Sequence, residues 1–531
     1  MSPRVEFPRH GVHVCVEPHA TLLAAARAAG VPIDAQCSGV GTCGRCVVRA
    51  EGALSAPAEE ELAVLGVDAV ASGHRLACRA RVLGDVRVHD ADVAPVRAVA
   101  HATEASFWEP DSRKHLGAGS LGLAFDIGTT TVVLALVDLS TGDVEATRSM
   151  LNAQFPWGAD VMSRVAAVQH EGLEALRAPL VAQVVRLANA VMADAGAPAS
   201  AVSELVMCGN TAMRGIFLGD DVGPLGAAPY EGVPLAARDA SGAELGLAGL
   251  EHVSVHALPC ASAFIGADVV AGIVATRFAL SEGPALFIDL GTNAEVVLAT
   301  GSGLLAASAA AGPALEGAGT TSGMRAAPGA IERVRRTEDG LELDVIGGVP
   351  PLGLCGSGTL DLLAALLDAG VLDPSGRLQA PGGPLDERVI ERDGVRAFVV
   401  DAGRPVVLTQ KDVRAVQLAK GAIRAAIELL LDEAGIRAEQ VERVVVAGGF
   451  GLHADASSLV RIGMVPHGLE TRFSFVGNAA LEGARAACVS RAARREADRV
   501  AASIRTLDLA SAPQFQGAFV RALDFPPKNP R

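Results

Sequence analysis

The chain has 531 residues, too many for a single hydrophobic core, and this length predicts several domains, one of them large. Half of the residues are apolar and only 20% are charged, which excludes a largely disordered chain. The formal net charge of -15 would repel a phosphate backbone, so nucleic acid is not an expected partner.

The sequence offers no membrane-spanning stretch. No window approaches 18 uninterrupted apolar residues, and the N-terminal residues lack a basic segment followed by an apolar one. We therefore expect a cytoplasmic protein with no membrane partner.

The first elements predict the order strand, helix and metal loop. Val12 to Val16 alternate valine with His13 and Cys15, as a half-buried strand does. Thr21 suits the N-cap of the helical segment that follows, and Gly30 suits its end. A glycine-rich loop with cysteines comes directly afterwards.

Four cysteines have the spacing of an iron-sulfur site. The pattern is C-x5-C-x2-C with a distant fourth cysteine, which is the plant-type spacing with one extra residue in the first gap. Thiolates suit iron, and four of them complete a 2Fe-2S cluster. A zinc site normally pairs two C-x2-C units and only one is present, so iron-sulfur is favoured over zinc. The predicted ligands are Cys37, Cys43, Cys46 and Cys78.

The other five cysteines are isolated in the chain, and we expect most of them to be packing residues. They are Cys15, Cys208, Cys260, Cys355 and Cys488.

Residues 92–119 mix proline, glycine and charge without periodicity, which predicts a linker. Beyond it, LGLAFDIGTTTVVLALVDLSTG reads as strand, glycine turn and strand. A similar unit recurs at ALFIDLGTNAEVVLATGSG. This repetition predicts two related lobes whose hairpins face one cleft. Helices are expected at 174–196 and 411–435, and a strand at the start of VERVVVAGGFG.

The two hairpin turns are candidate phosphate sites. In each copy an aspartate ends a strand, a glycine permits a tight turn, and hydroxyl or amide side chains follow. One such hairpin alone would predict nothing more than a turn, whereas two copies favour a nucleotide site. The first copy supplies Asp126, Gly128, Thr129 and Thr130, and the second supplies Asp289, Gly291, Thr292 and Asn293.

A third motif completes the candidate ATP site. In VVVAGGFG, Gly448 and Gly449 leave room for a nucleoside against the backbone. No Walker-type P-loop is present. Asp126 and Asp289 are the predicted catalytic residues, holding Mg²⁺ and positioning the attacking water. The ordered motifs resemble those of the acetate and sugar kinase, Hsp70 and actin superfamily (ASKHA).

Residues 5–90 resemble plant-like and adrenodoxin-like 2Fe-2S ferredoxins. Together with the ATPase motifs, nearly the whole chain resembles the reductive activators of corrinoid proteins, the RACo family. Three further segments look like that family: Met207 to Met213, Ala310 to Ile331 and Leu354 to Asp373.

The resemblance implies a multidomain α/β protein. It consists of an N-terminal β-grasp 2Fe-2S ferredoxin-like domain followed by a two-lobed, ribonuclease H-like ASKHA ATPase domain. The expected boundaries are 1–91 for the first domain, 92–119 for the linker and 120–531 for the second domain, with lobes at about 120–280 and 281–500.

The resemblance also implies an ATP-dependent reductive activator. Such a protein transfers one electron from its 2Fe-2S cluster to the inactive cobalt(II) corrinoid of a methyltransferase, restoring cobalt(I). The implied cofactors are the cluster and ATP with Mg²⁺. The implied partners are a corrinoid-binding protein or corrinoid-dependent methyltransferase and an external electron donor, while the oligomeric state stays open.

Two departures from the family accompany the resemblance. The short linker predicts that the chain lacks the middle domain of longer members. No second cysteine-rich segment occurs near the C-terminus, which excludes the variant with additional four-iron clusters.

Three alternatives are open at this point. One is a redox-gated small-molecule kinase of the ASKHA superfamily. Another is a non-catalytic ferredoxin-type carrier, against which the aspartates at both turns count. The third is an activator of a radical dehydratase, which would hold a four-iron cluster between two subunits rather than in a separate module.

Overall fold

The fold is that of a computed structural model. It describes residues 2–31, 33, 46–90, 108–111, 120–317, 319–338, 340–392, 394–401, 403, 406–448 and 454–527.

The N-terminal module is built on one five-stranded sheet with the order β2-β1-β5-β3-β4. The strand predicted at Val12 is β2, but it does not open the module, because β1 precedes it and pairs with it antiparallel. The central pair β1 and β5 is parallel. The strands are β1 (Arg4–Phe7), β2 (Val12–Cys15), β3 (Val47–Leu54), β4 (His74–Leu76) and β5 (Val82–Asp90).

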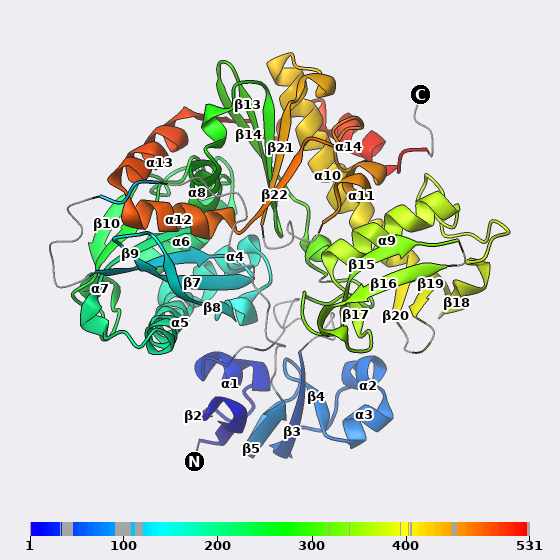
Figure 1. The fold of residues 1–531 in the computed structure, drawn as a ribbon. Helices are drawn as coiled ribbons and strands as arrows, with labels where there is room; N and C mark the ends of the chain where they lie inside the picture. The colour runs from blue at the N-terminus through cyan, green and yellow to red at the C-terminus, as the bar shows by residue number, and fades with distance from the viewer. Residues whose placement is uncertain are drawn as a thin grey trace.

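Helix α1 (Leu22–Ala28) begins as predicted. The Thr21 side chain accepts a hydrogen bond from the Ala24 amide at 3.1 Å, and Gly30 follows the helix with φ 65°. Leu22, Leu23 and neighbouring alanines of α1 are buried against the sheet. Two short helices, α2 (Glu59–Leu65) and α3 (Val67–Ala71), lie at the other end of the module (Figure 1).

The first lobe has a six-stranded sheet with the order β10-β11-β9-β6-β7-β8. The predicted hairpin is confirmed as β6 and β7, which pair antiparallel, while β9 joins β6 in parallel. The strands are β6 (Leu121–Ile127), β7 (Thr131–Asp138), β8 (Val144–Leu151), β9 (Val202–Gly209), β10 (Arg238–Ser241) and β11 (Ser254–Ala257).

Helices cover this sheet. The predicted helix at 174–196 is confirmed as α5, and one apolar cluster joins it to α4, α6 and the sheet. The helices of this lobe are α4 (Val161–Glu171), α5 (Leu173–Asp194), α6 (Thr211–Leu218), α7 (Gly242–Leu245) and α8 (Ala267–Thr276).

The second lobe also contains a six-stranded sheet, with the order β22-β21-β12-β13-β14-β23. Its hairpin β12 and β13 is the predicted second copy, and β21 pairs in parallel with β12 as β9 does with β6. The strands are β12 (Ala285–Leu290), β13 (Ala294–Thr300), β14 (Gly303–Ala309), β21 (Arg443–Ala447), β22 (Phe473–Gly477) and β23 (Ile504–Thr506).

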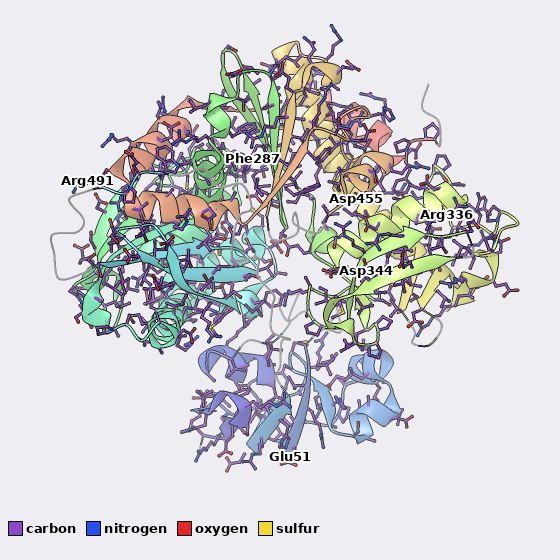
Figure 2. The ribbon with its side chains drawn as sticks, in the orientation of Figure 1. Glu51, Phe287, Arg336, Asp344, Asp455 and Arg491 are labelled. Atoms are coloured by element: carbon purple, nitrogen blue, oxygen red, sulfur yellow. The ribbon has the colours of Figure 1, made fainter. Side chains whose placement is uncertain are left out.

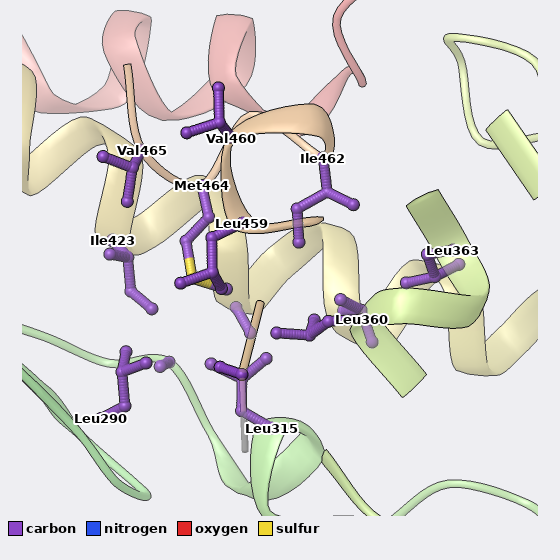
Figure 3. Close-up of a cluster of buried hydrophobic side chains, with 14 of the residues drawn as sticks. Leu290, Leu315, Leu360, Leu363, Ile423, Leu459, Val460, Ile462, Met464 and Val465 are labelled. Carbon is purple, nitrogen blue, oxygen red and sulfur yellow. The ribbon is translucent and has the colours of Figure 1, made fainter. Parts of the chain in front are cut away.

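Helix α10 (Gln410–Ala434) is the predicted helix at 411–435, and Gly435 caps it in a left-handed conformation. Its apolar face packs into the core of the second lobe, where Ile423 lies near Leu315, Leu360 and Met464 (Figure 3). Other helices of this part are α9 (Gly356–Ala369), α11 (Ala456–Arg461) and α14 (Phe515–Leu523).

Two three-stranded sheets flank this core, β16-β15-β17 and β18-β19-β20. Their strands are β15 (Ala330–Arg336), β16 (Leu341–Val345), β17 (Gly353–Leu354), β18 (Val389–Arg392), β19 (Val395–Asp401) and β20 (Val406–Thr409).

The two lobes meet through α8 and α12 (Ala479–Val489), which pack together between the large sheets (Figure 1). A Cβ on Gly483 of α12 would lie 2.1 Å from the Ala271 carbonyl oxygen of α8. The two backbones therefore touch, which only glycine permits. Helix α13 (Arg491–Ser503) then leads to β23 at the edge of the second sheet.

Part of the predicted linker is described. The Trp108 ring lies under the Arg277 guanidinium at 4.8 Å, and the Asp111 amide donates to the Val489 carbonyl oxygen at 3.0 Å. The described residues 108–111 are thus anchored at the ends of α8 and α12.

In the described part of the chain, no helix combines the length and the apolar character that crossing a membrane would require.

The N-terminal module contains one buried ion pair whose removal should be costly. Glu61 is fully buried and accepts from Arg75 Nε at 3.0 Å, Arg75 Nη2 at 2.9 Å and the amides of Ala58 and Leu76 at 3.0 Å. Glu61→Ala would leave the positive charge of Arg75 buried without its carboxylate partner. We expect this change to destabilise the module by about 3–5 kcal/mol.

Thermal unfolding of the full chain, followed by circular dichroism and visible absorption, measures this loss. The exposed neighbour Glu59→Ala is the matched control and should leave the transition in place. Equal transitions for the two variants would contradict a structural role of the pair.

Candidate functional site

The structure brings together the two predicted cluster ligands that it describes. Cys46 directly precedes β3 and Cys78 follows β4, and pairing of these strands places their Sγ atoms 3.3 Å apart. Both thiols are buried and free of disulfide bonds. Two thiols at this separation suit ligands of one iron-sulfur cluster. Cys37 and Cys43 lie outside the described residues, so the full ligand set stays a prediction.

A cleft of about 260 Å³ lies between the two lobes, and both predicted turns line it. All but one of the predicted nucleotide-site residues line this cleft. The exception is Gly449, which lies outside the described part of the chain. The residues brought together are Asp126, Gly128, Thr129, Thr130, Asp289, Gly291, Thr292, Asn293 and Gly448.

The glycines of the site are required by close backbone contacts. A Cβ on Gly128 would lie 2.5 Å from the Thr131 carbonyl oxygen. Gly448 has φ 97°, and a Cβ there would lie 2.5 Å from the Leu290 carbonyl oxygen. Gly448 thus lets the end of β21 approach the second turn closely.

One carboxylate joins the two turns. Glu316 Oε2 accepts from the Thr130 hydroxyl of the first lobe at 3.0 Å, and its Oε1 accepts from the Thr292 hydroxyl of the second lobe at 2.9 Å. The duplicated turns therefore converge on one side chain. The Thr130 and Thr292 hydroxyls could also donate to phosphate oxygens. Glu316 therefore competes directly with a phosphate for these two donors.

Acidic side chains gather at the cleft. Asp126 and Asp289 end strands β6 and β12, while Asp268 belongs to the first turn of α8. Asn478, the N-cap of α12, donates to Asp126 Oδ2 at 2.9 Å. The amide thus fixes the orientation of the Asp126 carboxyl group.

Burial raises the pKa of all three aspartates. The pKa of Asp289 rises to about 8 through burial and repulsion by Asp268 and Asp126. Burial, with a smaller contribution from Asp268, raises the pKa of Asp126 to about 7, although the Asn478 hydrogen bond opposes this. Burial raises the pKa of Asp268 to about 6. The site is therefore suited to receive positive charge.

Among the described residues, no group of three or more His, Cys, Asp or Glu side chains is close enough to enclose a metal ion. Mg²⁺ does not need such a cage, because it keeps several waters and binds through one or two carboxylates together with phosphates. Asp126 and Asp289 fit this mode.

Sequence reasoning missed several polar residues of the cleft, among them Asp268, Glu295, Glu316, Asn210 and Asn478. Asp268 and Asn478 resemble ordinary helix starts, and Glu316 is one acidic residue in a glycine-rich loop. Asn210 caps α6 and donates to the Thr129 hydroxyl at 2.9 Å. Asn210 and Glu316 lie in two of the segments that resembled the RACo family, and this resemblance was the available signal.

The isolated cysteines mostly follow the packing expectation. Cys208, Cys260, Cys355 and Cys488 are buried, whereas Cys15 is exposed, which agrees with the expectation that most of these five cysteines are packing residues.

Three family models match consecutive parts of the chain. A 2Fe-2S iron-sulfur cluster binding domain matches residues 7–83, the RACo middle region matches 121–281, and the C-terminal ASKHA domain of RACo matches 283–531. The corrinoid activation enzyme RamQ of Eubacterium limosum is 34% identical over 407 residues, covering 74% of this chain and 68% of that protein.

The chain belongs to the RACo family. A solved reductive activator for a corrinoid, iron-sulfur protein has 28% identity, a TM-score of 0.72 and 99% coverage of both chains. The [Co(II) methylated amine-specific corrinoid protein] reductase of Methanosarcina barkeri is 29% identical, covering 68% of this chain and 69% of that protein.

These findings confirm the predicted fold class of a ferredoxin-type domain followed by ASKHA-type domains. They correct one expectation. We expected the middle region of the RACo family to be missing, but its model matches residues 121–281. The error arose because this region is itself the first lobe, with its own phosphate-type hairpin, and not an insertion within the linker.

The raised pKa values predict an unusual pH dependence of stability in the Mg²⁺- and nucleotide-free protein. Between about pH 4 and 8 the folded aspartates hold protons that the unfolded chain has lost. Stability therefore falls as pH rises from 6 to 8. We expect the loss of these protons to lower the melting temperature by roughly 2–4 °C between pH 6 and 8. Asp289→Asn should make this decrease in melting temperature smaller. The exposed Asp143→Asn is the control, and an unchanged pH profile in Asp289→Asn would contradict the assignment.

Glu316→Ala should loosen the contact between the lobes in the nucleotide-free protein. It removes the shared acceptor of Thr130 and Thr292, so we expect a loss of about 1–3 kcal/mol in the free energy of unfolding. The same change should tighten binding of Mg²⁺-free nucleotide, because a negative charge beside the phosphates is lost. Denaturant unfolding and calorimetry measure both effects. Glu282→Ala, exposed before β12, should change neither.

Proposed function

We propose that this protein is an ATP-dependent reductive activator that transfers one electron from a 2Fe-2S cluster to the cobalt(II) corrinoid of a partner protein. The partner is a corrinoid-binding protein or corrinoid-dependent methyltransferase, which regains cobalt(I). One observation carries the proposal: a cluster-binding domain and an inter-lobe cleft with two phosphate-type turns share one chain of the RACo family.

The electron count is simple. A 2Fe-2S cluster held by this chain would supply a one-electron carrier: it would accept one electron from an external donor and return it to cobalt(II), so that one centre would be oxidised as the other is reduced. Cys46 and Cys78, whose Sγ atoms lie 3.3 Å apart, would hold the cluster together with Cys37 and Cys43.

The transfer needs an energy source. A plant-type cluster has a reduction potential of about -400 mV. The cobalt(II)/cobalt(I) couple is expected to have a more negative potential, so the cluster is too weak a reductant for it. Each 59 mV of mismatch in a one-electron step lowers the equilibrium constant roughly tenfold. We propose that complex formation changes the ligation of cobalt(II), and that the nucleotide cycle then separates the partners.

The cleft residues have distinct roles in this proposal. Thr129, Thr130, Thr292 and Asn293 donate hydrogen bonds to the phosphates, and the backbone amides of both turns add further donors. Asp126 and Asp289 would hold Mg²⁺, which would neutralise charge on the phosphates, and would align the attacking water.

The two-lobed architecture links the chemistry to movement. Because the phosphates contact one turn from each lobe, nucleotide binding favours the closed arrangement, and hydrolysis removes part of this bridge. The α8–α12 contact has small residues on both helices and joins the lobes behind the cleft. It is the natural hinge of the closure.

The central test is Asp289→Asn, compared with wild type and Asp143→Asn. We expect wild-type ATP hydrolysis to rise when a cobalt(II) corrinoid protein is added, and Asp289→Asn to lower the rate on the order of a hundredfold. Cobalt(I) formation, followed by visible absorption, should stop after the first turnover in this variant.

Two results would overturn the proposal. Repeated ATP-independent cycles of cobalt reduction in Asp289→Asn would separate ATP from activation. ADP formation that depends on an added hydroxyl or carboxylate substrate, and not on a corrinoid protein, would instead indicate the kinase alternative.

A further inference from the structure

The short turn Phe155–Trp157, here called the docking turn, lies where the N-terminal module meets the first lobe. Arg27 of α1 reaches it. Arg27 Nε donates to the Pro156 carbonyl oxygen at 3.0 Å, and the Arg27 guanidinium carbon lies 5.3 Å from the centre of the Trp157 ring. Both a charge-assisted hydrogen bond and a cation–π contact therefore join the module to the lobe.

Glu171 completes this contact from α4. Its Oε1 lies 3.6 Å from Arg27 Nη1, and its Oε2 accepts from Trp157 Nε1 at 2.8 Å. The Arg27 side chain retains only 20% of its exposure. One carboxylate thus orients both partners of the stacked pair, which is the arrangement of a specific interface and not of incidental surface contact.

On its other side, the segment before the docking turn is bonded to the first phosphate-type turn. The Asn152 amide donates to the Thr130 carbonyl oxygen at 2.8 Å, and Asn152 Nδ2 donates to the Gly128 carbonyl oxygen at 2.8 Å. Asn152 Oδ1 accepts from the Gln154 amide at 2.8 Å. The position of the phosphate-type turn therefore depends on this segment.

Arg164 makes a second connection. This fully buried side chain donates through Nε to the Gly158 carbonyl oxygen at 3.2 Å and through Nη2 to the Thr129 carbonyl oxygen. It thereby ties the residue after the docking turn to the phosphate-type turn. A buried guanidinium has no water to replace a lost partner, so a shift of one carbonyl group requires a shift of the other.

The second lobe also reaches the docking turn. The Arg325 guanidinium lies 5.0 Å from the centre of the Phe155 ring, and Arg325 lines the nucleotide cleft. Three parts of the molecule thus meet at this turn of the first lobe: the cluster module contacts Pro156 and Trp157, and the second lobe contacts Phe155.

We propose that the docking turn couples the cluster module to the nucleotide cleft. Seating of Arg27 preorganises the first phosphate-type turn through Asn152 and Arg164, and bound nucleotide in return holds the module against the first lobe. The coupling is reciprocal by thermodynamic necessity. It rests on the proposed nucleotide site and adds to it a defined route by which nucleotide occupancy controls the position of the electron carrier.

The test compares Arg27→Ala with Arg49→Ala in the full, cluster-loaded chain. Arg49 is exposed on β3, two residues from Glu51, which lies on the side of the module away from the lobes (Figure 2). Calorimetric titration with the Mg²⁺ complex of a non-hydrolysable ATP analogue should give a dissociation constant roughly three- to tenfold higher for Arg27→Ala, and an unchanged one for Arg49→Ala. The visible spectrum of the cluster verifies that each variant has a folded module.

Glu171→Gln provides the second variant, because it removes the charge facing Arg27 but retains an acceptor for Trp157. It should weaken nucleotide binding by a smaller factor, and its effect should largely disappear in the Arg27→Ala background. Amide hydrogen exchange tests the effect of the nucleotide on the cluster module. The nucleotide analogue should slow exchange of the α1 amides in wild type but not in Arg27→Ala.

An equal dissociation constant for wild type and Arg27→Ala, with unchanged exchange of α1 upon nucleotide addition, would overturn the coupling while leaving the nucleotide site in place. Failure of the wild-type protein itself to bind the analogue would instead overturn the proposed function, and the coupling with it.

Discussion

The close contact of α8 with α12 is the constraint on which the rest of the structure depends. Gly483 meets the Ala271 carbonyl oxygen, and a Cβ on Gly272 would lie 2.7 Å from the Phe287 ring. Helices that touch at their backbones cannot slide without clashes, because packed interiors leave no free volume. This contact prevents the two sheets from sliding past each other and sets the place about which the lobes can turn. It thereby brings turns that are far apart in the sequence to opposite sides of one cleft.

The cleft formed in this way has an electrostatic cost. It gathers Asp126, Asp268, Asp289 and Glu295. Burial raises the pKa of each, and repulsion by neighbouring carboxylates adds to this rise for Asp126, Asp289 and Glu295. Carboxyl groups in such a site either keep protons or receive a cation. A phosphate ligand would add further negative charge, so the site suits a nucleotide that arrives with its metal ion. The same side chains that lower the stability of the nucleotide-free protein at high pH thus favour binding of the metal–nucleotide complex.

Several features follow from the residues alone, and others do not. The D-x-G-T turns were recognisable because tight turns restrict residue type, and the Cys46 and Cys78 positions because thiolate spacing reflects the metal. Asp268 and Asn478 carried no comparable signal, since helix N-termini favour these residues everywhere. Their importance appears only when α8 and α12 place them beside Asp126. The first lobe was recognised by its hairpin, but its match to the middle region was missed because linker length says nothing about how lobes are divided.

The sequence by itself determined the local chemistry: the cluster-type cysteines, the duplicated phosphate-type turns, and the helices and strands with clear periodicity. These depend on interactions between residues near one another in the chain. The tertiary structure decided which distant groups meet: Glu316 between Thr130 and Thr292, and Arg27 against Trp157. Such meetings depend on how whole lobes and modules pack, and single-residue patterns do not encode that packing.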